Sequence, residues 1–235
     1  MFYVDWTYMA LVLPALAFSL WASSRVHSTF RTYSGQYIRC GLTGAEAARM
    51  ILDANGLYHV RIERVAGNLT DHYDPRSNVI RLSDSVFSSA TTAAVGVAAH
   101  ECGHAIQHAT GYLPIKIRSA IVPLTNLGSK IAMPLIILGI LFSYASAYFI
   151  SIAYLGVICF SLCALFQLVT LPTEYNASRR AIGALEGSGR LYGDEISGAQ
   201  KVLNAAALTY VAALAVSLTQ LFRLLLRVRR NDRRR

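Results

Sequence analysis

Residues 131–173 contain no charged side chain, and this limits the folds that are open to the chain. A helix needs about 20 apolar residues to cross the hydrocarbon core of a bilayer, so the stretch is long enough for two spans. The serine, alanine and tyrosine residues between Ser143 and Ser151 form the natural turn between them. One very long buried helix is the alternative, but its length would be unusual. We therefore expect a transmembrane helical hairpin over residues 119–172.

Two further apolar segments lie near the ends of the chain. Residues 2–21 are almost wholly apolar but include Asp5, whereas a cleaved signal peptide begins with basic residues, so we expect an uncleaved anchor helix over residues 1–22. The last apolar segment leads into an arginine-rich tail, which predicts a transmembrane or interfacial helix over residues 203–235. With 54% hydrophobic and 15% charged residues, the composition predicts a mainly α integral membrane protein with about four transmembrane helices.

The net charge of +9 could indicate a nucleic-acid partner, but its distribution argues against one. Seven of the 22 lysine and arginine residues lie between Arg223 and Arg235, beside an apolar segment and without interleaved aromatic residues. Basic residues that flank a membrane span are the simpler account. The partner expected from this charge is the lipid bilayer, and no nucleic acid.

The polar residues 23–118 are expected to form a small α+β region. Residues 43–46 read Thr-Gly-Ala-Glu, a capping box that opens a helix, and an Asn-Gly pair at residues 55–56 closes it. Residues 58–65 alternate as a strand does, and residues 79–83 form a second short strand after an Asp-Pro turn. We expect the two strands to form a small hairpin or sheet edge that leads into the next helix.

That helix carries the sequence His-Glu-x-x-His at residues 100–104. Residues four apart on a helix lie about 6 Å apart along its axis on nearly the same face, so His100 and His104 can bind one Zn²⁺ ion. Glu101 then lies at the edge of the site, in the position of a general base. Chance is the alternative, but a segment as small and apolar as residues 93–99 rarely holds such a motif without partners. The helix is expected to begin near Ser88 or Ser89 and to end at Thr110 and Gly111.

Zinc in a hydrolase usually has three protein ligands, so one ligand is missing from the motif. His108 lies about 12 Å along the axis from His100, too far for both to bind one ion, and is better assigned to a supporting or substrate-facing role. Glu174 is the better candidate because the hairpin returns it to the side of the motif helix. It would begin a third-ligand helix within residues 173–202. The alternative for Glu174 is an interfacial carboxylate paired with Arg179 or Arg180.

These motifs together resemble the YugP-type neutral zinc metallopeptidases of bacterial membranes. The resemblance covers nearly the whole chain and rests on residues 71–75, 79–83, 100–108, 118–123 and 171–181. A more distant likeness is to the membrane gluzincins of the HtpX and Ste24 type, in which a later Glu-x-x-Ala-Asp motif supplies the third ligand. Here Ser178 replaces that aspartate, which in the distant group orients a ligand histidine. The orienting residue is therefore open among Asn176, Ser178 and Asp84.

The resemblance and the chemistry both imply peptide-bond hydrolysis. His100, His104 and Glu174 would hold one Zn²⁺ ion and Glu101 would act as general base, within a zincin-like catalytic region. Help in the transition state could come from Arg179, Tyr175 or His108. Substrates would be polypeptides, including membrane or misfolded proteins, and the edge of strand 79–82 could bind them in extended form. The competing hypothesis is a catalytically inert, zinc-stabilised membrane scaffold that binds polypeptides, but a scaffold has no need of Glu101.

Four spans would place the polar regions on one side of the membrane and both termini on the other. Basic residues in both parts favour the cytoplasm, so the two preferences conflict. The first helix usually dominates, and the four cysteines form no C-x-x-C pair that would indicate disulfides, so we expect the active site on the cytoplasmic face. An interfacial last segment would remove the conflict.

Overall fold

The structure is a computed structural model and describes residues 6–146 and 148–233, so residues 1–5 of the predicted anchor and 234–235 of the predicted tail lie outside it. The chain divides into two compact units, which we call the apolar unit and the polar unit. The apolar unit consists of Met1–Trp21, Ile117–Leu171 and Tyr210–Arg235. The polar unit consists of Ala22–Lys116 and Pro172–Thr209.

In the polar unit, α2 (Gly44–Ala54) begins with the predicted capping box. The side-chain Oγ1 of Thr43 accepts a hydrogen bond from the backbone N–H of Glu46 at 3.3 Å, and Glu46 Oε2 accepts one from the backbone N–H of Thr43 at 2.9 Å. The two side chains thereby satisfy N–H groups that the helix itself leaves without acceptors. The helix ends at Asn55, and Gly56 follows with a φ of 71°, so its predicted start and end are confirmed.

The sheet has three strands in the order β1-β3-β2, formed by Arg61–Val65, Val79–Ser83 and His72–Asp74 respectively. β1 pairs with β3 in parallel, from Arg61 opposite Val79 to Val65 opposite Ser83, and β2 pairs with β3 in antiparallel fashion. The predicted hairpin between residues 58–65 and 79–83 is therefore wrong. Those two strands run in the same direction because the chain first turns back through β2, a strand of three residues that is too short to show alternation in sequence.

The strand order also determines which edge of the sheet could bind a substrate. β3 lies in the middle of the sheet, with β1 on one side and β2 on the other, so its main-chain edges are already paired. The prediction that strand 79–82 offers a free edge to an extended substrate is wrong. The edge that remains open on that side belongs to β2.

The motif helix is α4 (Thr92–Ala109), and Thr91 caps its N-terminus by accepting a hydrogen bond from Ala94 N at 3.4 Å. The helix begins a few residues later than predicted because Ser88 ends the short helix α3 (Asp84–Phe87) and Thr91 forms an isolated β-bridge with Tyr37. Its predicted end is confirmed, since Thr110 is the C-cap and Gly111 follows with a φ of 65°.

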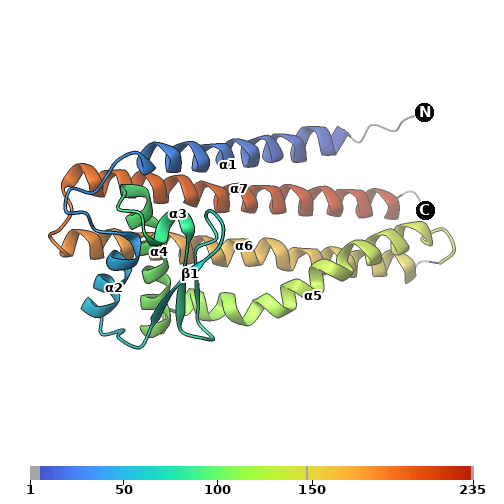
Figure 1. Ribbon diagram of the computed structural model, residues 1–235. Helices are drawn as coiled ribbons and strands as arrows, with labels where there is room; N and C mark the ends of the chain where they lie inside the picture. Colours follow the sequence, from blue (N-terminus) through green and yellow to red (C-terminus); the bar gives the residue numbers. More distant parts are fainter. Residues whose placement is uncertain (1–5, 147, 234–235) are drawn as a thin grey trace. The chain divides into compact units, whose positions relative to one another are not determined.

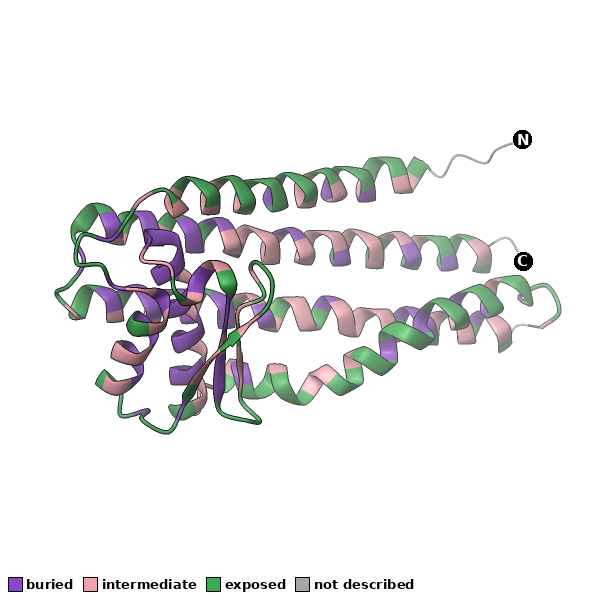
Figure 2. Ribbon diagram, viewed as in Figure 1, coloured by how far each residue is buried: buried purple, intermediate pink, exposed green. Residues whose placement is uncertain are grey.

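Small residues on α4 form the centre of the polar unit's core. Ala94, Ala98 and Ala99 are fully buried and pack in one cluster with the larger side chains of α2 and β3. Figure 1 shows α4 between α2 and the three strands, and Figure 2 shows that it is the most continuously buried helix of this unit. Because alanine lets neighbouring backbones approach closely, α4 can contact several elements at once.

Residue 174 lies inside α6 (Tyr148–Gly187), a single helix that continues from the apolar unit into the polar unit. The prediction that Glu174 begins a new helix is therefore wrong. The return of polar residues at 174 marks a change in what surrounds the helix and does not interrupt its backbone hydrogen bonding. Even Pro172 is accommodated inside the helix, as is common in helices that cross membranes.

Among the residues that the structure describes, four helices are long and apolar enough to cross a membrane: the π-helical segment η1 (Tyr8–Val12) continued by α1 (Leu13–Ser34), then α5 (Leu113–Leu141), α6 and α7 (Gly193–Asp232). α5 ends at Leu141 and α6 begins at Tyr148, and the sequence predicted the turn of the hairpin between Ser143 and Ser151. Together with the three short strands, these helices confirm the predicted class of mainly α membrane protein with a small α+β region.

The C-terminal half of α7 belongs to the apolar unit and packs against the hairpin there. Leu224 and Val228 are buried in one cluster with residues of α5 and α6, and Asn231 Nδ2 donates a hydrogen bond to Ser143 Oγ at 2.7 Å. A helix lying on the membrane surface would not make these contacts along its length. The packing favours the transmembrane alternative for residues 203–235.

Gly103 on α4 lies against the backbone of α6, and a Cβ atom at this position would overlap the carbonyl oxygen of Ala177. We expect Gly103→Ala to destabilise the protein by about 1–3 kcal/mol, because one backbone must move away from the other. The change should lower the midpoint of thermal unfolding in detergent. Gly183→Ala on α6 is the matched control, since nothing lies within 4 Å of its added Cβ, and it should leave the midpoint unchanged or raise it. Equal midpoints for the two variants would contradict this account.

Candidate metal centre

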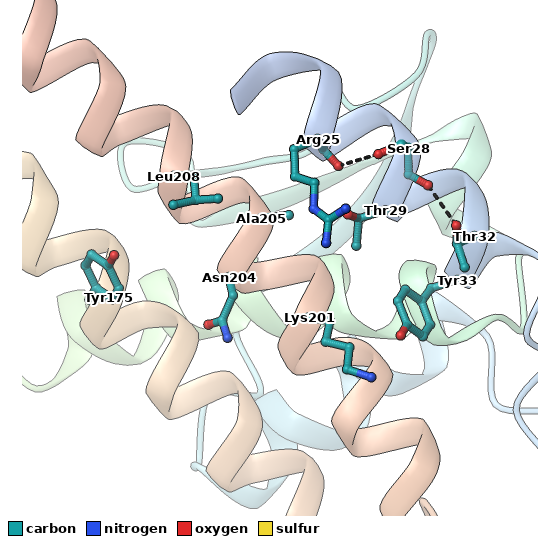
Figure 3. A pocket seen from close by; sticks show the side chains of 10 residues that line it. All are labelled: Arg25, Ser28, Thr29, Thr32, Tyr33, Tyr175, Lys201, Asn204, Ala205 and Leu208. Carbon is teal, nitrogen blue, oxygen red and sulfur yellow. Dashed lines mark hydrogen bonds between the residues drawn. The ribbon is translucent and has the colours of Figure 1, made fainter. Parts of the chain in front are cut away.

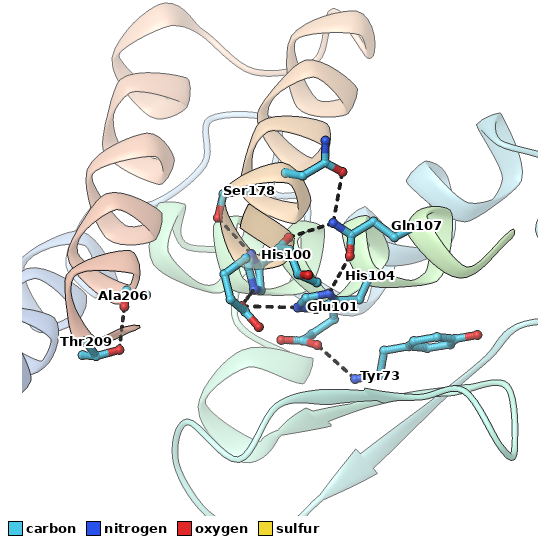
Figure 4. A network of polar contacts seen from close by, with 11 residues as sticks. Tyr73, His100, Glu101, His104, Gln107, Ser178, Ala206 and Thr209 are labelled. Atoms are coloured by element: carbon cyan, nitrogen blue, oxygen red, sulfur yellow. Dashed lines mark hydrogen bonds and ion pairs between the residues drawn. The ribbon is translucent and has the colours of Figure 1, made fainter. Parts of the chain in front are cut away.

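Three side chains from two helices converge in the polar unit: His100 and His104 from α4, and Glu174 from α6. Oε2 of Glu174 lies 3.2 Å from Nε2 of His100 and 3.5 Å from Nε2 of His104. The two imidazole rings meet edge to face with their centroids 4.8 Å apart. One ligand atom from each residue can be chosen so that all three lie within 4.8 Å of one another. These are the three ligands predicted from the sequence. Figure 4 shows the two histidines with their hydrogen-bond partners Ser178 and Gln107.

The approach of α4 and α6 explains why these residues meet. Glu174, Ala177, Ser178 and Ala181 follow one another at spacings of three, one and three residues, and all four are buried, so they occupy one face of α6. The small side chains on this face allow the backbone of α6 to lie against Gly103. Glu174 is therefore held between the two histidines, with only 2% of its surface exposed.

Each histidine is oriented by a hydrogen bond at its other ring nitrogen. Nδ1 of His100 lies 3.1 Å from Ser178 Oγ, and Nδ1 of His104 lies 3.0 Å from Gln107 Oε1. The amide of Gln107 donates from Nε2 to the carbonyl oxygen of Thr173 at 2.7 Å, which leaves Oε1 as an acceptor. In the neutral ring of His104, Nδ1 then carries the proton, and Nε2 has the lone pair that a metal ion could accept.

The three residues that the sequence offered for orienting a ligand histidine make different contacts in the structure. Ser178 contacts His100 directly, whereas Asn176 lies one contact further away, because its Oδ1 accepts from Gln107 Nε2 at 3.0 Å. Asp84 instead accepts a hydrogen bond from Arg64 Nε at 2.6 Å, so its assignment to this role was wrong. Gln107 was missed as a site residue. Its spacing of three residues from His104 was the available signal, since it places both on one side of the helix.

Glu101 is buried next to the three-residue cluster and contacts the sheet rather than α6. Its Oε2 accepts a hydrogen bond from the backbone N–H of Tyr73 at 2.9 Å, which ties it to the open edge of β2. On the same side, burial raises the pKa of Asp71, although this carboxylate accepts hydrogen bonds from the backbone and side chain of Ser83. The nearby charge of Glu101 raises it further.

The remaining predicted residues lie further from the cluster. The ring centroid of His108 lies 5.5 Å from that of Tyr73, on the sheet side of α4. Tyr175 is 44% exposed and lines a pocket with residues of α1 and α7, and Arg179 is also exposed. Arg180 donates from Nε to Asn176 at 2.8 Å.

The donor set fits a zinc ion. Two imidazole nitrogens and one carboxylate oxygen are ligands that zinc accepts, and a buried carboxylate between two imidazoles needs a positive charge nearby. Without an ion, protonation of the histidines would supply that charge. Burial opposes the charged form of His104, but the hydrogen bond to Glu174 and the charge of Glu174 outweigh it and raise the pKa of His104. A divalent cation would satisfy the same carboxylate and leave both rings neutral.

Comparison with known proteins agrees with this chemistry. Residues 8–229 match a protein family described as "Putative neutral zinc metallopeptidase". The chain belongs to this family. It is also 46% identical over 216 residues to the "Putative membrane protease YugP" of Bacillus subtilis (strain 168), covering 92% of this chain and 94% of that protein. No solved structure matches the chain. The family resemblance drawn from the motifs is confirmed, and membership supports a zinc protease role in a membrane.

Gln107 is fully buried, and its removal should disturb the metal site without removing a ligand. We expect Gln107→Leu to weaken zinc binding by about 10–100-fold, because His104 loses the acceptor that fixes its orientation and protonation. The dissociation constant can be measured by competition with a chelator in detergent. Thr110→Val is the control on the same helix, since Thr110 Oγ1 donates to backbone carbonyls of its own helix, those of Ile106 at 2.8 Å and Gln107 at 3.4 Å, and not to the side chain of Gln107. Unchanged zinc affinity in Gln107→Leu would show that the hydrogen bond does not support the site.

Proposed function

We propose that the protein is a membrane-embedded, zinc-dependent endopeptidase that hydrolyses peptide bonds. The observation that carries this proposal is the buried cluster of His100, His104 and Glu174 with a further carboxylate, Glu101, directly beside it. A site that only bound zinc for stability would need the first three residues but not the fourth. Family membership supports the same class of reaction.

In this proposal, His100, His104 and Glu174 hold one Zn²⁺ ion. Zinc at such a site lowers the pKa of water and polarises a carbonyl group. Glu101 takes a proton from the attacking water and returns it to the leaving amine. Its Oε2 already accepts the Tyr73 N–H, so Oε1 is the atom that carries the proton. The hydrogen bond from the main chain keeps Glu101 oriented while the proton moves.

His108 is the best-supported of the three candidates for stabilising the transition state. Tyr175 and Arg179 are exposed, and they lie four residues apart on one face of α6, whereas Glu174 lies on the buried face. His108 lies one turn after His104 and packs beside Tyr73, whose backbone N–H holds Glu101. A substrate that reaches Glu101 would pass this side of α4.

The open edge of β2 is the proposed binding site for an extended polypeptide. In an antiparallel pair, the N–H and C=O groups of one residue point to the same side. The N–H of Tyr73 points away from β3 toward Glu101, so its carbonyl also faces the open edge. Because the N–H already binds Glu101, the carbonyl of Tyr73 is the main-chain group offered to a substrate there, and a main-chain contact carries little sequence preference. The substrates would therefore be polypeptides with exposed extended segments, including misfolded membrane proteins.

We expect Glu101→Gln to retain zinc and to lose peptidase activity by about 10²–10⁴-fold, because it keeps the shape of the side chain but cannot accept the proton. Glu174→Ala should lose both zinc and activity. Casein cleavage and bound zinc can be measured on the same detergent-purified samples. Glu186→Gln, an exposed glutamate on α6, is the matched control and should match the wild type.

Two results would contradict the proposal. If the wild type binds zinc but cuts nothing, and Glu101→Gln changes nothing, the inert scaffold becomes the better account. If Glu174→Ala retains zinc at full occupancy, the third ligand is another residue.

We also propose that the active site faces the cytoplasm, as the basic residues after the first span favour. Cys40 is exposed in the polar unit, whereas Cys102 is buried and burial raises the pKa of its thiol. A membrane-impermeant maleimide should therefore label Cys40 in lysed cells but not in intact cells. Cys40→Ser is the control that identifies the labelled site. Equal labelling of intact and lysed cells would place the active site outside.

A further inference from the structure

A pocket in the polar unit lies between α1 and α7, away from the metal centre. Its volume is about 620 Å³. α1 contributes residues from Arg25 to Tyr33, and α7 contributes residues from Lys201 to Leu208, in both cases at spacings of three and four residues. Each helix therefore presents one face to the pocket, and Figure 3 shows the side chains of both helices around it. Tyr175 of α6 completes the lining.

The pocket and the metal centre lie on different faces of α6. Glu174 points into the contact with α4 and is almost fully buried, whereas the next residue, Tyr175, is exposed and turned by about 100° around the helix. The metal ligands and Glu101 do not line the pocket. The proposed catalytic chemistry therefore gives the pocket no role.

The lining chemistry suits an anion. Arg25 and Lys201 both line the pocket, and no acidic residue is among the described residues that do. Among the residues that the structure describes, no carboxylate pairs with either cation within 4.0 Å, and Lys201 Nζ lies 5.9 Å above the ring of Tyr33. Arg25 and Lys201 thus line one pocket without a paired carboxylate among the described residues, and an anion in the pocket would be attracted to both.

Uncharged donors add to the two cations. Asn204 Oδ1 accepts a hydrogen bond from Gln200 Nε2 at 2.8 Å, which leaves the Nδ2 amide of Asn204 as the group that can donate to a ligand. Thr29 and Tyr33 contribute hydroxyl groups. By contrast, the hydroxyls of Ser28 and Thr32 donate to the backbone of their own helix. A phosphate group, with several acceptor oxygens, matches this set of donors.

The position of the pocket along both helices indicates where the phosphate comes from. Trp21, which is 53% exposed and stacks on Phe18, ends the apolar part of α1, and tryptophan is enriched at the membrane–water interface. Arg25 follows one helical turn later, about 6 Å further along the axis. On α7, Lys201 stands just before the apolar segment, and Leu208 lines the pocket at the apolar end. Charged groups followed by apolar ones match the order of headgroup and acyl chain in a lipid.

We propose that this pocket binds the phosphate group of an anionic phospholipid, with Arg25 and Lys201 as its principal contacts. Arg25 offers a planar pair of donors to two phosphate oxygens, Lys201 offers a point charge, and Asn204 offers a neutral donor. The acyl chains leave the pocket past Leu208. The bound lipid links α1 to α7, which makes it part of the packing of the polar unit. This proposal is independent of the peptidase activity.

The test compares lipid binding to the detergent-purified full chain by native mass spectrometry. Dioleoylphosphatidylglycerol should bind at least about tenfold more tightly than dioleoylphosphatidylcholine, which has the same acyl chains but no net charge. The double variant Arg25→Gln/Lys201→Gln should lose this preference. Arg31→Gln/Lys116→Gln is the matched control, because it removes the same two charges from exposed positions that do not line the pocket, and it should keep the preference. Unchanged zinc content in both double variants would show that both are folded.

Three outcomes would overturn the proposal. Equal binding of the two lipids by the wild type would exclude a phosphate-selective site. An equal loss of the preference in both double variants would assign it to diffuse surface charge. Equally tight binding of soluble glycerol phosphate at the same two residues would make the ligand a soluble phosphate rather than a lipid.

Discussion

The site depends on the contact between two helix backbones, α4 and α6, at Gly103 and Ala177. A hydrogen at the position of the Gly103 side chain lets the carbonyl oxygen of Ala177 approach the motif helix. This approach is what allows Glu174, three residues before Ala177, to reach both histidines. A bulkier residue at 103 would separate the helices, so the identity of Gly103 controls the distance between Glu174 and the two histidines.

Because α4 and α6 lie so close together, a polar side chain buried between them must find its hydrogen-bond partners within the protein. Gln107 is fully buried between the helices, and an unsatisfied amide there would cost about 1–3 kcal/mol. The structure satisfies it on both sides: Oε1 faces His104, and Nε2 donates to Thr173 and Asn176. One side chain thus joins the two helices and orients His104, a candidate metal ligand. The packing of the polar unit and the chemistry of its site are therefore coupled through Gln107.

The sequence predicted those features that depend on local spacing. The capping box at Thr43, the cap at Gly111 and the spacing of His100 and His104 are local patterns, and the structure contains each of them. Features that depend on contacts between distant segments were harder to predict. The parallel pairing of β1 with β3 cannot be read from two strands in sequence, and Gln107 acquires its role only when α6 lies against α4.

α6 runs without interruption from its apolar residues to Glu174 in the candidate metal centre. Leu171 is the last residue that α6 contributes to the apolar unit, and Glu174 follows three residues later, about 5 Å along the same helix axis. A loop between the two would let the third ligand move independently of the span. In one unbroken helix, the backbone hydrogen bonds instead fix the position of Glu174 relative to the apolar residues that precede it on α6.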